Sequence, residues 1–460
     1  MAACPPLSLA ALECSLCAAS CAAARPAGGI PRLSGTISYE EFFTEHLLKN
    51  LPAVIEESLV HDWPCLKNWR TDTPRGPRIN WDYLRHHFGA SRLPLACAGP
   101  PLTLAAYIDT HCQGSEAAPP PTPPPYFKDW HFFREFAAHP TFCLPQLFHD
   151  DWLNHFCDTH VSREGQHRDD FRFVYVGAAH TCTPLHHDVL SSFSWSTNVA
   201  GTKLWLFFPP ALAPRLLDPS GAAPALRLAD DGCTPRLDEA DLERMPDFPL
   251  ADGIVLKQHS GETVFVPSGW YHQVWNLEAT VSINHNWANA CNLHHMWQQL
   301  HDAMATVSNH LTDLDVSPPE WEDLRQRILK ADSGFDVPTF IDFLAVNGDA
   351  ILQRLCPATL NAGLHSGWRE CPGAHLHKGP EDLCLSDGDG ACVCWKRDHV
   401  SLPRPEERVC IFSLKRMRGV IAVASRHPAF QHACAAGGLP SCFPAIIHLA
   451  AYFHLCRSCR

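Results

Sequence analysis

Residues 182–190, "CTPLHHDVL", place two histidines directly before an aspartate. Side chains alternate between the two faces of a β-strand, so on a strand His186 and Asp188 share one face and His187 points to the other. An imidazole and a carboxylate that face a common point can be two ligands of one metal ion. The chain holds 29 histidines, so this triplet alone is weak evidence. A third ligand must come from elsewhere.

Residues 266–277, "VPSGWYHQVWNL", offer that ligand, because His272 follows a turn and starts a strand-like run. Two histidines and one carboxylate form the facial triad of non-haem Fe(II) oxygenases. Such a triad leaves metal positions open for a chelating cosubstrate and O2. The competing interpretation is a set of ordinary core or surface histidines, and the strand-borne third ligand counts against it.

The neighbouring run "GTKLWLFFPP" (201–210) contains a lysine within an apolar strand. Burying the charge of Lys203 is costly unless it has a partner, and a carboxylate of a bound dicarboxylic acid would supply one. The alternative is an edge lysine that extends its amine to solvent. Thr183 adds a hydroxyl close to the candidate metal ligands.

Short β-branched and aromatic runs, separated by glycine and proline, fill residues 171–287. They include "FRFVYVG", "FSWSTNVAG", "KLWLFFPP" and "ETVFVPSG". This texture is typical of antiparallel strands in a sandwich or barrel. From residue 291 the apolar residues change to helical spacing, and we expect helices to continue to about residue 355.

The ends of the chain have a different character. Near the N-terminus, Ser38 and Glu41 form a capping-box pattern that predicts a helix over 38–50. Further helices are expected in "INWDYLRHHFG" and "LTLAAYIDTHC". The predicted organisation is a poorly ordered tail (1–35), a support region (36–160), a catalytic core (161–290), C-terminal helices (291–355) and an irregular Cys-rich segment (356–460) with one helix near 409–431.

Composition bounds the class of protein. Hydrophobic residues make up 46% of the 460 residues, which fits a globular chain with a large core. The formal net charge of −13 argues against a general binder of nucleic-acid phosphates. No apolar run reaches the roughly 18 residues of a membrane span, and no convincing signal peptide is visible. We therefore expect a cytoplasmic protein with reduced thiols, the nucleus being a second compartment.

The stretches "TPLHHDVLSSFSWSTNVAGTKLWLFFPP" and "GETVFVPSGWYHQVWNLEATVSINHNW" resemble the JmjC family of Fe(II)- and 2-oxoglutarate-dependent dioxygenases. The resemblance covers about residues 36–355 and implies a mainly β fold with flanking helices, a double-stranded β-helix (cupin-like jelly roll). It implies that His186, Asp188 and His272 bind Fe(II). It further implies cosubstrate contacts from Lys203, Thr183, Tyr126, Ser194 and Asn286. Ser194 departs from the asparagine that several relatives carry there.

The resemblance is strongest to small JmjC protein hydroxylases. It implies hydroxylation of a lysine side chain in a protein, a translation termination (release) factor, with Fe(II), 2-oxoglutarate and O2. The alternatives are a histone N-methyl-lysine demethylase and a non-catalytic binding scaffold. Neither a nucleic acid nor a membrane is an expected direct partner, and the oligomeric state stays open.

The C-terminal region departs from the family. Residues 357–408 do not resemble it, and we interpret them as an insertion or a mispredicted exon. The cysteines of the region lack the spacing of a zinc site.

Overall fold

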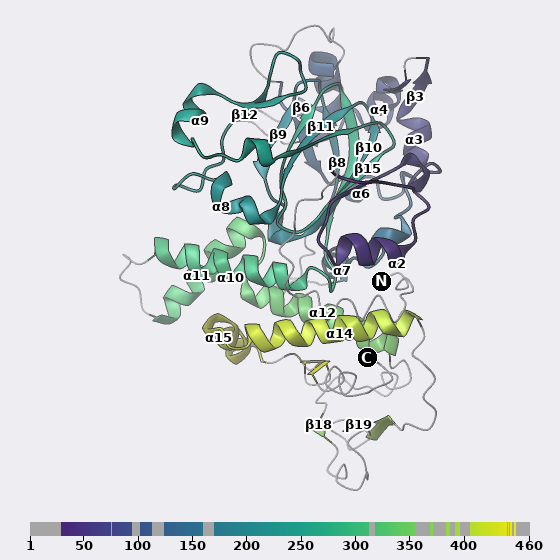
Figure 1. Cartoon of the computed structure of the whole chain (residues 1–460). Coiled ribbons are helices and arrows are strands. Elements are labelled where there is room, and N and C mark those ends of the chain that lie inside the picture. Colours follow the sequence, from purple (N-terminus) through teal and green to yellow (C-terminus); the bar gives the residue numbers. More distant parts are fainter. Residues whose placement is uncertain are drawn as a thin grey trace.

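The computed structural model describes residues 29–74, 76–93, 102–112, 124–159, 170–311 and 318–355. Further along it describes residues 369–370, 383–386, 392–395, 405–438, 440, 442–443 and 446–447. Two β-sheets form the centre of the molecule, and a layer of long helices lies along one side of them (Figure 1).

The two sheets contain seven and four strands. The larger sheet has the order β1 (Arg32–Leu33), β2 (Ala53–Ile55), β15 (Thr263–Val266), β10 (Phe193–Ala200), β17 (Thr280–Trp287), β8 (Arg172–Gly177), β7 (Phe127–Trp130). The smaller sheet has the order β14 (Ile254–Gln258), β11 (Lys203–Phe208), β16 (Tyr271–Asn276), β9 (Cys182–His186). From β8 to β11, successive strands alternate between the sheets, as they do from β14 to β17. This is a jelly roll, and the predicted cupin-like fold is confirmed.

Strand β11 shows why the central strands are almost continuously apolar. Trp205 and Phe207 pack in a cluster with residues of the larger sheet, between the two sheets. Leu204, Leu206 and Phe208 belong to a second cluster on the opposite face. Residues inserted between β11 and β14 supply the cover of that outer face. Because both faces are buried, the strand lacks the apolar–polar alternation of a half-exposed one.

The inserted segment that covers the smaller sheet consists of short elements. They are α8 (Ala213–Leu216), β12 (Leu226–Leu228), β13 (Pro235–Leu237) and α9 (Glu239–Arg244).

The N-terminal region supports the other side of the β core. Ser38 caps α2 (Tyr39–Phe42) by accepting the Glu41 N–H at 3.2 Å, and the helix continues into the π-helical turn η1 (Phe43–Leu47). The other expected helices are present. Helical elements of this region include α3 (Pro64–Asn68), α4 (Trp81–Phe88), α5 (Leu104–Tyr107), η3 (Ile108–Cys112), α6 (Phe132–Glu135) and α7 (Trp152–Thr159).

The prediction of a poorly ordered tail over residues 1–35 is wrong for the last residues of that range. Arg32 and Leu33 form β1, which pairs in parallel with β2 at the edge of the larger sheet. The Arg32 guanidinium also donates to the carbonyl of Lys257 at 2.7 Å and pairs with Glu262. These backbone and side-chain bonds order a segment whose composition alone predicts a tail. Residues 1–28 lie outside the described part of the chain.

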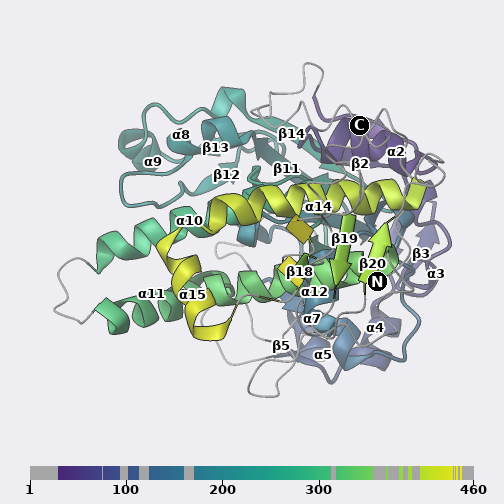
Figure 2. The ribbon, with the colours of Figure 1, turned by 90° about the horizontal axis from the view of Figure 1, so that it is seen from below.

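The C-terminal helices form the layer beside the sheets. They are α10 (Leu293–His310), α11 (Pro318–Ser333), α12 (Val337–Leu355), α14 (Pro405–Ala424) and α15 (Pro428–Gly437). Helix α12 contacts both α7 and α14, so it connects the N-terminal support to the last helices (Figure 2). None of the helices in the described residues is long and apolar enough to cross a membrane.

The single helix predicted near 409–431 is wrong, because the chain breaks after Ala424 and starts a new helix at Pro428. Proline suits the first turn of a helix, and the His427 side chain accepts the Ala429 N–H at 3.2 Å. Most of the predicted irregular segment lies outside the described residues. Within it, β18 (Arg369–Glu370), β19 (Leu383–Ser386) and β20 (Cys392–Trp395) form a small antiparallel sheet.

Candidate active site

Three side chains meet between the sheets. The candidate ligand atoms of His186, Asp188 and His272 all lie within 4.8 Å of one another. His186 on β9 and His272 on β16 are direct register partners, with ring centroids 4.3 Å apart. Asp188 follows two residues after the end of β9. In the described residues no other group of three or more His, Cys, Asp or Glu side chains is arranged to hold a metal ion.

Hydrogen bonds to backbone carbonyls set the orientation of the two imidazoles at the candidate metal site. His186 Nδ1 lies 2.8 Å from the carbonyl oxygen of Pro184, and His272 Nδ1 lies 3.1 Å from that of Trp270. When Nδ1 carries the proton and donates it to the carbonyl, the lone pair of Nε2 is free to bind a metal. Burial, together with the nearby His186, lowers the pKa of His272, so its ring is neutral at pH 7. A neutral imidazole is the form that binds metal.

Two side chains hold the carboxylate of Asp188. The Ser194 hydroxyl donates to Oδ2 at 2.7 Å, and the Asn286 amide donates to Oδ1 at 2.9 Å. The sequence predicts that Ser194 and Asn286 contact the cosubstrate, and the structure shows that both also hydrogen-bond to the candidate metal ligand. A carboxylate has about four acceptor positions, so these two bonds leave room for a metal. Sequence comparison could find both residues but could not show what they touch.

Alternation along β9 separates His187 from the metal group. The His187 ring packs edge-on to Tyr271 at 4.9 Å, and Tyr271 belongs to the outer apolar cluster. Simple alternation would turn Thr183 away from His186, because the two residues lie an odd number of positions apart. A register shift between the two lets Thr183 pair with Val274, whose side chain lies in the inner cluster. The irregularity therefore turns Thr183 to the same side as His186.

Lys203 lies on the same inner face. Lys203 is the register partner of Asn276, and it lies four residues before Phe207, which is the register partner of His272. Its side chain is buried, with 2% of the residue exposed, and its amine donates to the Ser282 hydroxyl at 2.8 Å. Burial lowers the pKa of Lys203 to about 7. No carboxylate in the described residues forms an ion pair with this amine, so an anionic ligand would gain from reaching it.

Tyr126 lies near the Lys203 end of this face. It is buried and hydrogen-bonds with Asn276, the register partner of Lys203. Burial is the main cause that raises the pKa of its phenol, so the hydroxyl stays protonated at pH 7. The structure thus brings Tyr126 and Lys203 to one end of the inner face and the metal group to the other.

A ladder of small polar residues connects the two ends, and sequence reasoning missed most of it. Strands β10 and β17 pair Ser194 with Asn286, Ser196 with Asn284, and Asn198 with Ser282. The Ser196 hydroxyl is buried and has no hydrogen-bond partner among the described residues. The signal was present in the run "SFSWSTN", where every second residue is serine or asparagine and the residues between them are Phe193, Trp195 and Thr197.

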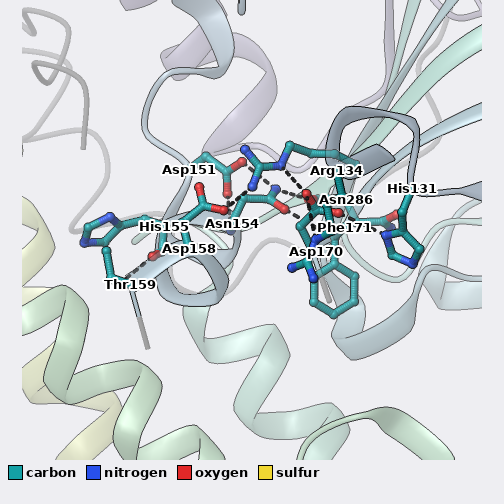
Figure 3. A network of polar contacts seen from close by, with 11 residues as sticks. His131, Arg134, Asp151, Asn154, His155, Asp158, Thr159, Asp170, Phe171 and Asn286 are labelled. Atoms are coloured by element: carbon teal, nitrogen blue, oxygen red, sulfur yellow. Dashed lines mark hydrogen bonds and ion pairs between the residues drawn. The ribbon is translucent and has the colours of Figure 1, made fainter. Parts of the chain in front are cut away.

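Charged side chains secure the start of β8 beside the site (Figure 3). Asp170 is buried and accepts hydrogen bonds from His131 Nδ1 and Arg172 Nε, each at 3.0 Å, with Arg134 Nε at 3.6 Å. Burial by itself would raise the pKa of Asp170, but the His131 hydrogen bond and the two arginines outweigh it and hold the pKa below its usual value. The carboxylate is therefore ionised and paired in the folded protein.

A jelly roll with two histidines and one carboxylate between its sheets defines a cupin-type metal protein. Residues 136–293 match the family model described as "Cupin-like domain". The chain is 36% identical to the "2-oxoglutarate and iron-dependent oxygenase JMJD4" of Homo sapiens over 73% of this chain and 79% of the relative. It therefore belongs to this JMJD4 family of JmjC proteins, which confirms the predicted resemblance.

Other relatives carry different activities in their names. The chain is 33% identical to the "Arginine-specific demethylase JMJ20" of Arabidopsis thaliana over 69% of this chain and 70% of the relative. It is also 33% identical to the "Bifunctional arginine demethylase and lysyl-hydroxylase psr-1" of Caenorhabditis elegans, over 37% of this chain and 40% of the relative. The shared region is thus compatible with more than one oxidation of a protein side chain.

Proposed function

We propose that this chain is a protein hydroxylase of the cytoplasm that uses Fe(II), 2-oxoglutarate and O2 to hydroxylate a lysine side chain. The substrate implied by the sequence resemblance is a translation release factor. One observation carries the proposal. The metal-ligand group of His186, Asp188 and His272 shares the inner face of the jelly roll with Lys203, which has no carboxylate partner in the described residues.

The donor set fits Fe(II), because it combines two imidazoles with one carboxylate. When bound, Fe(II) with 2-oxoglutarate supplies the activation of O2 that hydroxylation of a C–H bond requires. The backbone carbonyls of Pro184 and Trp270 hold the imidazoles with Nε2 directed to the metal position. Ser194 and Asn286 hold the carboxylate, so the ligands are oriented before metal arrives.

Lys203 and its neighbours would bind the cosubstrate. A protonated Lys203 would pair with the distal carboxylate of 2-oxoglutarate, and the hydroxyl of Thr183 would hydrogen-bond to it. Tyr126 and the hydroxyl of Ser196, which has no hydrogen-bond partner in the described part of the chain, would supply further polar contacts to the cosubstrate. Trp205 and Phe207 pack against His272 at centroid distances of 5.7 and 5.8 Å and give the metal group an apolar inner side.

Demethylation of arginine is the second candidate, because two of the similar proteins are named arginine demethylases. Demethylation of N-methyl-lysine in histones is the alternative that the sequence left open. All three reactions oxidise a C–H bond: the two demethylations oxidise a methyl group on a side-chain nitrogen, and hydroxylation oxidises a carbon of the lysine side chain. The metal site alone therefore does not distinguish the three reactions. The products do.

Mass spectrometry of matched substrates distinguishes these reactions. The full chain is incubated with Fe(II), 2-oxoglutarate and either a release factor, a methyl-lysine peptide or a methyl-arginine peptide. We expect the release factor to gain one oxygen atom on a lysine, and Asp188→Ala to give no product. Formaldehyde from a methylated peptide, without a hydroxylated lysine, would contradict lysyl hydroxylation. Equal product from Asp188→Ala would contradict the metal site.

A further inference from the structure

Helix α7, which lies outside the jelly roll, forms hydrogen bonds to the end of β17 at two points. The Trp152 N–H donates to the carbonyl of Ala288 at 2.7 Å. Two residues further along, the Asn154 side chain donates to the carbonyl of Asn286 at 2.9 Å (Figure 3). Asp151 orders this end of the helix, because its carboxylate accepts both the Asn154 N–H at 2.9 Å and the Asn154 amide at 2.6 Å.

Asn154 stands where the pairing of β8 with β17 ends. The last ladder pair joins His285 to Arg172, and the next bond runs from the Asn286 N–H to the Phe171 carbonyl at 2.9 Å. Beyond it, Asn154 accepts the Phe171 N–H at 2.8 Å while it donates to Asn286. Asn154, which is 3% exposed, thus continues the strand ladder with its side chain. It gives hydrogen-bond partners to backbone groups whose burial without partners would cost free energy.

Asn286 connects Asn154 to the metal site through its backbone and its side chain. Its backbone carbonyl receives Asn154, and its side-chain amide donates to Asp188 Oδ1 at 2.9 Å and to the Ser192 hydroxyl at 3.1 Å. A hydrogen bond weakens steeply when its geometry is lost, so the reach of this amide depends on where the Asn286 backbone lies. Ser194 holds the other carboxylate oxygen from β10 and does not depend on α7.

We propose that Asn154 is a positioning residue for the metal-binding carboxylate, acting through Asn286. The inference rests on the proposed function, since it assumes that Asp188 binds the metal. Partners of metal ligands typically change metal affinity by about 10–100-fold when removed. Asn154 acts one step further away, and Ser194 remains, so we expect Asn154→Ala to weaken metal binding by about 10-fold.

The experiment is an Mn(II) titration of the full chain, followed by electron paramagnetic resonance. It compares wild type, Asn154→Ala, Asn286→Ala and the double variant. Because Asn154 acts through Asn286, we expect the double variant to bind Mn(II) as weakly as Asn286→Ala, with no further loss. If Asn154→Ala does not fold, Asn154→Ser takes its place, since a hydroxyl can still donate to Asn286 and should retain part of the affinity.

Asn347→Ala is the matched control. Asn347 on α12 is also fully buried and donates to the carbonyls of Phe343 at 2.9 Å and Trp152 at 3.3 Å, so it touches the same helix α7 without reaching β17. We expect this variant to lose stability and keep the wild-type Mn(II) affinity. Wild-type affinity in Asn154→Ala, additive losses in the double variant, or equal weakening in Asn347→Ala would each overturn the inference. Failure of wild type itself to bind Mn(II) would instead overturn the metal site.

Discussion

The affinity for 2-oxoglutarate should fall as pH rises from 7 to 9, because Lys203 must be protonated to pair with a carboxylate. Burial lowers the pKa of the free amine to about 7. A bound carboxylate stabilises the charged form and so raises the pKa of Lys203 in the complex. Binding is therefore strongest below the pKa of the free amine and is lost as pH rises above it.

The size of the effect follows from the protonated fraction. With a pKa of about 7, about half of the amine is protonated at pH 7, about a tenth at pH 8 and about a hundredth at pH 9. If the neutral amine does not bind, the apparent Kd rises about fivefold by pH 8 and about 50-fold by pH 9. The last figure corresponds to about 2 kcal/mol of binding free energy.

Isothermal titration of 2-oxoglutarate into the Mn(II)-loaded protein measures this dependence without turnover. The control is Lys203→Arg, because a guanidinium stays charged across the whole range and should give a flat profile whatever its absolute affinity. His272 contributes little to the slope, since its pKa is already lowered. A flat profile in wild type, or the same slope in Lys203→Arg, would refute the assignment of Lys203 to the cosubstrate.

Three further predictions concern the metal site and its support. His186→Ala should abolish Mn(II) binding while His187→Ala retains most of it, and equal losses in calorimetry would undo the alternation argument. Ser194→Ala should weaken Mn(II) binding by about tenfold or more, since it removes a bond to Asp188; an unchanged Mn(II) affinity with a weaker 2-oxoglutarate affinity would assign it to the cosubstrate instead. Asp170→Ala should lower the free energy of unfolding at pH 7 by about 1–3 kcal/mol, because it removes the acceptor of the hydrogen bonds from His131 and Arg172. The folded pKa of Asp170 is lowered, so this contribution is present above the usual carboxyl pKa of about 4 and is lost as pH falls below it. Chemical denaturation at pH 7 and at lower pH should therefore show the difference from wild type narrowing, and a constant difference would contradict the ionised pair.

The sequence by itself determined the features that depend on local periodicity. Alternation on one strand pairs His186 with Asp188 and turns His187 away. The continuous apolar run around Lys203 indicates a strand buried on both faces, and the cost of burying its charge points to an anionic ligand. Neither conclusion requires knowledge of which strands are neighbours.

The tertiary structure decided what depends on register and on distant contacts. The register shift in β9 turns Thr183 inward, against simple alternation, and a bulge of this kind leaves little trace in residue types. Sequence resemblance points to Ser194 and Asn286 but does not show that strand pairing brings both to Asp188. Asn154 is more than 100 positions from Asn286 and meets it only because α7 packs on the end of β17. Local patterns specify which face a side chain takes, whereas the partner on that face is set by packing between segments far apart in the chain.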